Sequence, residues 1–151
     1  MIESIVAITA LTICFTGVFS LLSTSLHSNR IVSDSSIATY LAAEGIEVVK
    51  NILDSTTIAG VPWGTGISTG DYEVDYASTV LMPNNSRTLS FDTTANTYDY
   101  SGFGTPTNFQ RKIRITVLSS EEIAVNSIVS WNTGLAQSRI NVEDHFMNWR
   151  P

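Results

Sequence analysis

Few residues of this 151-residue chain have side chains suited to catalysis or metal binding. Its two histidines are His27 and His145, and its one cysteine is Cys14. Glu143 and Asp144 precede His145, but neighbouring residues of a strand point to opposite faces, so they form a weak metal site. The chain has no serine nucleophile motif, glycine-rich phosphate loop or Cys/His cluster. We therefore predict that it is not an enzyme and has no catalytic, cofactor-binding or metal-binding residues.

The charge of the chain argues against a nucleic-acid partner. Its net charge of −6 leaves few groups to neutralise phosphates. The basic residues Arg111, Lys112 and Arg114 lie together in an alternating run that is typical of a strand. We interpret this cluster as a solvated strand face and predict no nucleic-acid binding.

Glu3 stands out because it is the only charged residue in an apolar stretch, Met1–Leu26. A helix needs about 20 mostly apolar residues to cross a bilayer core, and this stretch is long enough. No Lys or Arg precedes it, and no small-residue cleavage site follows it. We therefore predict a retained membrane anchor rather than a secretory signal peptide.

Two interpretations of Glu3 stay open at this point. A carboxylate costs about 2.5–3.5 kcal/mol at the bilayer centre but far less near the headgroups. Glu3 can lie at the headgroups, where the N-terminus of a helix also favours a negative charge. Alternatively, Glu3 meets a positive partner when the helix leaves lipid for a protein assembly.

The helix is expected to continue from His27 to Ser55 with a different surface. No proline occurs before Pro62, so nothing forces a break in a helix of roughly 50 residues. Gly45 within it is either neutral variation or a point of close packing against a strand. Apolar residues recur at the spacing of an amphipathic helix that buries one side. They are Ile37, Ala38, Leu41, Ala42, Ile46, Val48, Val49, Ile52 and Leu53.

The rest of the chain is expected to form a small antiparallel sheet. Residues 56–70 are rich in Gly and Thr and predict a loop, which Trp63 pins onto the domain. A second loop is expected at 101–108, and turns are expected at 83–86, 119–122 and 132–134. Alternating apolar residues predict strands at 71–77, 88–91, 98–100, 109–118, 123–131 and 140–149.

These elements predict an α+β fold. A long N-terminal helix has a protruding apolar half and an amphipathic half, and the amphipathic half covers one face of the antiparallel sheet. We expect a hydrophobic half-helix over residues 1–28 and a globular domain over 29–151. That domain consists of the amphipathic helix 29–55, the loop 56–70 and the sheet 71–149.

The whole chain resembles type IV pilin-like proteins: pilins, minor pilins and secretion pseudopilins. The segment Ile37–Asp54, IATYLAAEGIEVVKNILD, is similar to the stretch A-x-x-L-A-x-E-G-I-E-x-V-R-N of prepilin-type proteins. The ending, with Val129-Ser130-Trp131 and a strand up to Trp149-Arg150, also resembles that group. The resemblance implies a minor pilin or pseudopilin in a type IV pilus-like or type II secretion-like filament.

The resemblance also implies a route of assembly. The anchor holds the subunit in the cytoplasmic membrane, with its domain outside, until an ATPase-driven machine lifts it into an extracellular or periplasmic filament. Apolar helices of neighbouring subunits then bundle, and Glu3 pairs with the N-terminal ammonium of the adjacent subunit. The expected interface residues are Glu3, Ile5, Ile8, Thr9, Leu11, Thr12, Phe15, Phe19 and Leu22. Among the hydroxyls of this segment, Thr9 and Thr12 either help helices approach or bond to their own helix.

Two features depart from the family pattern. In the family, the leader peptide ends in Gly and the Glu is the fifth residue after the cut, whereas here Glu3 is third and no Gly precedes Met1. Either a leader and two mature residues are missing from the chain, or Met1 is the real start and the protein escapes normal processing. Cleavage by prepilin peptidase and N-methylation are therefore implied by the resemblance alone. The frequent C-terminal disulfide loop cannot form, because Cys14 is alone.

A second function class stays open beside the filament. A single-pass, membrane-anchored extracytoplasmic binding module would have the same anchor and sheet, would not polymerise, and would not need Glu3. An adhesin-like role at a filament tip would expose loop aromatics such as Trp63, Tyr98 or Phe103, which can equally belong to the core. The sequence does not distinguish adhesion, secretion, DNA uptake or motility.

Overall fold

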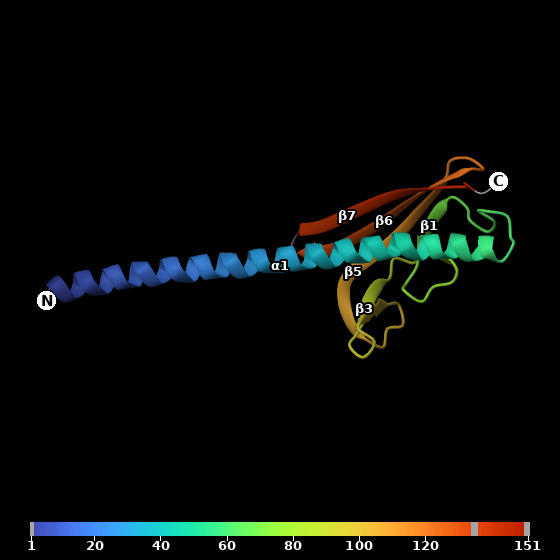
Figure 1. Ribbon diagram of the computed structural model, residues 1–151. Helices are drawn as coiled ribbons and strands as arrows, with labels where there is room; N and C mark the ends of the chain where they lie inside the picture. Colours follow the sequence, from blue (N-terminus) through green and yellow to red (C-terminus); the bar gives the residue numbers. More distant parts are fainter. Residues whose placement is uncertain (1, 134–135, 150–151) are drawn as a thin grey trace. The chain divides into compact units, whose positions relative to one another are not determined.

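The structure, a computed structural model, describes residues 2–133 and 136–149 (Figure 1). It begins with one continuous helix of 57 residues, α1 (Ile2–Ile58), and continues with strands of an antiparallel sheet. The predicted α+β fold with a long apolar N-terminal helix is confirmed. The chain divides into two compact units, one up to Ser36 and one from Ile37 on, which we describe separately.

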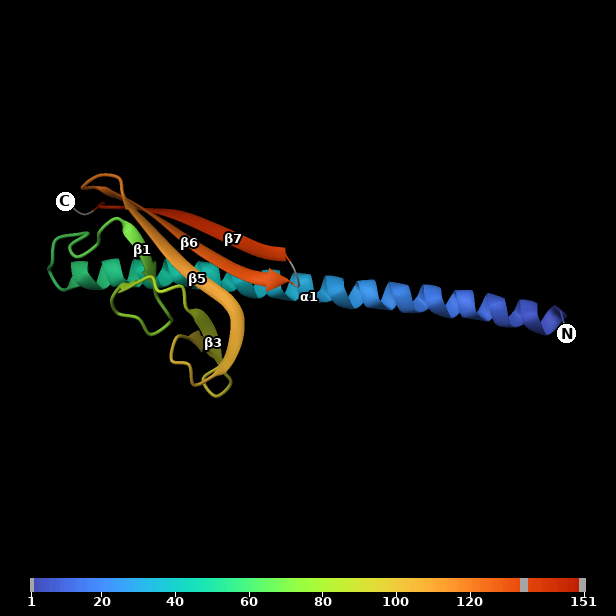
Figure 2. The same cartoon turned by 180° about the vertical axis from the view of Figure 1, so that it is seen from behind.

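The sheet is organised around its longest strand. The strands are β1 (Gly70–Glu73), β2 (Met82–Pro83), β3 (Thr88–Asp92), β4 (Thr97–Asp99), β5 (Thr105–Val117), β6 (Glu122–Thr133) and β7 (Ala136–Met147). β5 pairs with β6 along one edge, and with both β1 and β3 along the other. β6 pairs in turn with β7, so that β5, β6 and β7 lie side by side as the predicted meander (Figure 2).

α1 ends slightly later than the sequence predicts, at Ile58 instead of Ser55. The hydroxyl of Ser55 donates to the Ile52 carbonyl, and those of Thr56 and Thr57 donate to the Leu53 carbonyl, so this polar stretch stays helical. Gly60 then takes a positive φ of 76°, which favours glycine. The N–H groups of residues 60 and 61 donate to the carbonyls of residues 57 and 56, which is the glycine-terminated helix ending of the Schellman type.

Three strand predictions were wrong in extent, among them the predicted strand 140–149, which is β7 and runs from Ala136 to Met147. The predicted strand 71–77 ends at Glu73, because Asp75 and Ser78 form a turn in which the Asp75 N–H is bonded to the Ser78 hydroxyl. The predicted loop 101–108 ends early, because β5 already starts at Thr105 and pairs there with β3. The predicted turn 132–134 overlaps the end of β6, and its last residue lies outside the described part.

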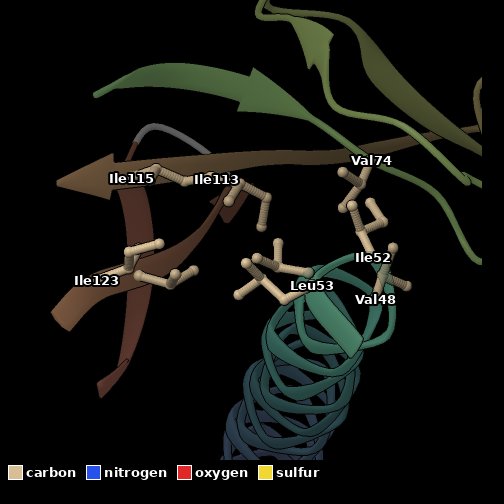
Figure 3. Close-up of a cluster of buried hydrophobic side chains, with 9 residues drawn as sticks. Val48, Ile52, Leu53, Val74, Ile113, Ile115 and Ile123 are labelled. Atoms are coloured by element: carbon tan, nitrogen blue, oxygen red, sulfur yellow. The ribbon is translucent and has the colours of Figure 1, made fainter. Parts of the chain in front are cut away.

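The C-terminal part of α1 packs on the sheet through a first apolar cluster. Figure 3 shows Leu53 directed at Ile113 and Ile123 of the sheet. Ile52 is directed at Val74, which follows β1. The partly buried Trp63 packs against the same cluster, as expected of the residue that pins the loop. The buried members are Val48, Val49, Ile52, Leu53, Val74, Ile113, Ile115, Ile123 and Val125.

A second cluster lies nearer to Ile37 along the helix. Its centre is aromatic, with the Phe109 ring centroid 6.1 Å from that of Trp131 and 6.4 Å from that of Tyr98. Tyr98 is thus part of the core, whereas Phe103 is almost fully exposed. The buried members are Ala38, Leu41, Ala42, Leu89, Phe109, Val129 and Trp131.

Gly45 lies at a close approach of the helix to the sheet. A Cβ at this position would lie 2.5 Å from the Ser127 hydroxyl and 2.8 Å from a methyl group of Ile113. Real Cβ atoms do not make such close contacts, so only glycine fits without a shift of the neighbours. Of the two interpretations of Gly45, the structure supports close packing.

Candidate functional site

The apolar side chains in the first part of α1 are exposed. The large apolar residues between Ile2 and Leu26 are 54–82% exposed, on every side of the helix. A helix that is apolar all round is stable only inside a protein core or a membrane. Within the described residues, α1 alone has a segment long and apolar enough to cross a membrane. By its length and composition, this segment could therefore span a membrane.

The predicted interface residues all lie in this exposed segment. Their spacing of three and four residues places the apolar ones along one face of the helix. At the edge of that face, Leu11, Phe15 and Val18 border smaller residues, Ala7, Ala10 and Cys14, and leave a shallow apolar hollow. The exposed apolar members of the predicted interface are Ile5, Ile8, Leu11, Phe15, Phe19 and Leu22.

The threonines of this segment are already bonded within the helix. Thr9 donates its hydroxyl to the Ile5 carbonyl at 2.9 Å, and Thr12 donates to the Ile8 carbonyl at 2.7 Å. Of the two roles considered for these hydroxyls, the structure of the single chain shows the local one. Their polarity is masked, so they do not oppose an apolar environment.

Glu3 lies in the first turn of α1, where the unpaired N–H groups of the helix favour a negative charge. Its side chain is exposed and is bonded to no other described residue. Every other carboxylate of the helix lies at Asp34 or beyond. Glu3 is therefore the one acidic group that is carried by the apolar segment.

The sequence analysis missed a buried arginine in the sheet domain. Arg111 of β5 is only 1% exposed, and its guanidinium donates to the Val74 carbonyl at 2.6 and 3.1 Å. The same group donates to the Leu41 carbonyl at 3.0 Å and to the Glu44 carboxylate at 3.1 Å. It therefore ties α1 to β5 and to the segment that follows β1. Because Arg111 is two residues from inward-facing Ile113 and shares its face of the strand, the alternation of β5 already indicated that it points inward.

A second buried charge lies close to this one. The Glu73 carboxylate is fully buried and accepts from the N–H groups of Asn85 and Arg87, both at 2.9 Å, and from the Arg87 Nε at 2.8 Å. Arg87 also lies over the Tyr100 ring, 4.5 Å from its centroid. Tyr100 donates its hydroxyl to the Arg111 carbonyl, and burial raises the pKa of Tyr100 to about 12. This network holds the loop after β2 to the sheet.

The interpretation of Arg111, Lys112 and Arg114 as one solvated face was wrong for Arg111. Lys112 and Arg114 do lie on the outer face, where both contact the Asp71 carboxylate, at 3.2 and 2.9 Å. The hydrogen bond from Arg114, together with the charge of Lys112, lowers the pKa of Asp71 below its ordinary value. Arg111 turns inward instead, because side chains alternate between the two faces of a strand.

His145 belongs to a small cluster on the same outer face. Its Nδ1 lies 2.7 Å from a Glu122 oxygen, and its Nε2 lies 3.3 Å from a Glu143 oxygen. The hydrogen bond to Glu122, and next that to Glu143, raises the pKa of His145. A hydrogen bond from Asn126 lowers the pKa of Glu143. No group of three potential metal ligands occurs among residues 2–133 and 136–149. We interpret the cluster as a link between β6 and β7.

Comparison with known proteins gives no match to this chain among protein families, curated proteins or solved structures.

Proposed function

We propose that this chain is a structural subunit, a minor pilin or pseudopilin, of a type IV pilus-like or type II secretion-like filament. The observation that carries the proposal is the division of one unbroken helix into two surfaces. Residues up to Leu26 expose large apolar side chains and include one charged residue, Glu3, whereas residues from Ala38 to Leu53 bury one side against a sheet. A subunit that moves from a membrane into a filament core needs such a helix.

The apolar segment suits both environments of such a subunit. Before assembly, lipid of the cytoplasmic membrane covers it. After assembly, apolar helices of other pilin or pseudopilin subunits cover it, and close packing rather than hydrophobic gain decides the contact, because lipid is equally apolar. The hollow beside Leu11 and Phe15, lined by small Ala7 and Ala10, is a surface against which another helix can pack.

Glu3 gives this packing its register. In the filament core its carboxylate is taken from water and pairs with the N-terminal ammonium of a neighbouring subunit. A buried charge that loses its partner costs about 3–5 kcal/mol, so a subunit in the wrong register is disfavoured. Prepilin peptidase is a further partner if the mature N-terminus is created by cleavage.

The test is the change Glu3→Leu, expressed in the native source alongside the wild-type chain. Membrane insertion is expected to persist, because a Leu favours lipid more than a Glu does. Incorporation into filaments is expected to fall by about tenfold or more, because the pairing that selects the register is gone. Mass spectrometry of sheared filaments and of the membrane fraction measures both quantities.

The matched control is Glu47→Gln, which removes an exposed carboxylate from the same helix outside the apolar segment. This variant is expected to enter filaments as the wild type does. Normal incorporation of Glu3→Leu would refute the proposal. Wild-type chain found in membranes alone, with an unmodified Met1 at its N-terminus, would instead support a membrane-anchored binding module.

A further inference from the structure

A polar hollow of about 560 Å³ lies on the outer face of β5, β6 and β7. Apart from Arg111, which also borders the hollow, the side chains that the strands contribute have the opposite parity to buried Phe109 and Val129, so they face away from the core of the domain. Its floor includes Ile128. The polar groups that line it include Asn84, Gln110, Lys112, Ser130, Gln137 and Arg139.

The sheet register brings these groups together from three strands. Gln110 of β5 lies opposite Ser130 of β6, and Ser130 lies opposite Arg139 of β7. Two residues further along β5, Lys112 lies opposite Ile128 of β6. The Gln110 amide donates to the Ser86 carbonyl at 2.8 Å, which fixes its orientation. The positions of these groups are thus set by the backbone of a sheet rather than by a loop.

Several of these side chains have hydrogen-bonding capacity to spare. The side chains of Ser130, Gln137 and Arg139 form no hydrogen bond or ion pair with another described residue. Lys112 shares the single carboxylate of Asp71 with Arg114, so that carboxylate cannot neutralise both cations. The hollow therefore offers unpaired donors to a ligand.

The charge of the hollow is opposite to that of the whole chain. None of the described residues that line it is Asp or Glu, although the chain has 14 such residues and a net charge of −6. On the same face, Glu143 lies opposite Asn126, further along β7 than Arg139. The cationic side chains at the hollow thus favour a ligand with a negative group.

A smaller polar hollow of about 150 Å³ adjoins the first one. The two share Gln110, Ser130 and Gln137. The second adds Thr88, Asn108 and Asn132 to the lining, so hydroxyl and amide groups continue along the face. A ligand with more than one ring in a row could therefore form hydrogen bonds with the protein along its length.

We propose that this face binds a saccharide that carries carboxylate groups. Arg139 and Lys112 would hold a carboxylate, and the amides and hydroxyls around Ser130 would bond to sugar hydroxyls. The hollow has a volume within the usual range of small-molecule sites, about 300–1,000 Å³. A polyphosphate such as nucleic acid fits less well, because two cations on an acidic chain neutralise few phosphates.

The proposal does not rest on filament assembly, because the hollow is complete within one chain. The test therefore uses the full chain in detergent micelles and measures binding by isothermal titration calorimetry. The probes are sialyllactose and trigalacturonic acid, each compared with a neutral counterpart, lactose and a galactose trisaccharide. At least one acidic saccharide is expected to bind about tenfold more tightly than its neutral counterpart.

Two variants locate the site on this face. Arg139→Gln is expected to weaken binding of the acidic saccharide about tenfold, because it removes a charged donor. Ser130→Phe is expected to abolish binding, because it fills the space shared by the two hollows while leaving the inward face of β6 unchanged. Arg30→Gln removes the same charge from an exposed helix position and is expected to leave binding unchanged. Circular dichroism verifies that each variant is folded.

Four results would overturn the proposal. One is that neither acidic saccharide binds at millimolar concentration, and another is that the neutral counterparts bind equally well. The third is that folded Arg139→Gln and Ser130→Phe both bind as the wild type does. The last is that a twelve-nucleotide single-stranded DNA binds more tightly than the saccharides and is weakened by both variants. None of these results bears on whether Glu3 directs filament assembly.

Discussion

The two parts of α1 have the same backbone and opposite surfaces. Between Ile2 and Leu26, large apolar side chains are exposed on all sides. Between Ala38 and Leu53, eight residues are buried and the exposed positions are mainly polar. The backbone hydrogen bonds of a helix do not depend on what surrounds it, so helix formation alone does not reveal the environment of either part. The distribution of apolar side chains does.

The surroundings of the two glycines of α1 differ in the same way. A Cβ at Gly17 would meet nothing within 4 Å, whereas a Cβ at Gly45 would collide with Ser127 and Ile113. The polar groups differ in the same way. Threonines of the first part bond to their own helix, whereas the Leu41 carbonyl of the second part accepts from Arg111 across the domain. The second part is thus held by tertiary contacts that the first part, within a single chain, does not have.

The largest effect on stability is expected from removing the hydrogen bonds that Arg111 forms between the helix and the sheet. Arg111→Met leaves the Val74 carbonyl without the two donors that it has in the native fold. We expect a loss of about 2–6 kcal/mol in the free energy of unfolding of the sheet domain, because the buried Val74 and Leu41 carbonyls lose their donors, at about 1–3 kcal/mol each. Urea unfolding of the full chain in mild detergent measures this loss.

Arg114→Met on the same strand is the control for that prediction. Arg114 is half exposed, and solvent screens its surface ion pair with Asp71, so this variant should lose much less stability than Arg111→Met. If both variants unfold at the same urea concentration, then Arg111 does not hold the helix to the sheet. The contrast between the two parts of α1 would then rest on apolar packing alone.

An intermediate effect is expected from adding one methyl group to each glycine. Gly45→Ala should destabilise the domain by about 1–3 kcal/mol, because overpacking outweighs the gain in helix propensity. Gly17→Ala should leave unfolding of the domain unchanged, because nothing lies near its Cβ. Thermal unfolding followed by near-ultraviolet circular dichroism compares the two variants. Equal melting temperatures would show that Gly45 is not a close contact.

The smallest effect on stability is expected from deprotonation of His145 in the cluster that links β6 and β7. The pKa of His145 is raised above its ordinary value of about 6.5. Its contribution to stability is therefore fully present below about pH 6.5 and is lost as the pH rises through the raised pKa. We expect a small fall in the stability of the sheet domain across that interval. NMR titration of the imidazole protons measures the pKa itself.

Histidine variants assign this pH dependence to one part of the molecule. His145→Gln should flatten the fall in stability, because no proton is then bound between Glu122 and Glu143. His27→Gln changes the other histidine, which is exposed on α1, and should leave the fall unchanged. A fall that persists in His145→Gln would assign it to another group.

Much of this fold could be predicted from short windows of sequence. The absence of proline before Pro62 and the periodic apolar stripe predicted one long helix with one buried side. Strict alternation predicted β5 and β6 to within a few residues at most ends. The segment proposed for assembly could also be predicted from the sequence, because an apolar run of this length is a local property.

The sequence by itself determined where apolar surface exceeds what a small domain can bury, and which residues alternate or recur at helical spacing. Only the tertiary structure decided which groups the buried Arg111 bonds to, that Gly45 must be a glycine, and that β5 extends back to Thr105. The reason is physical: periodicity is encoded by neighbours along the chain, whereas burial and pairing depend on residues far apart in it. The bond from Arg111 to the Leu41 carbonyl spans 70 positions of sequence, and no local pattern specifies it.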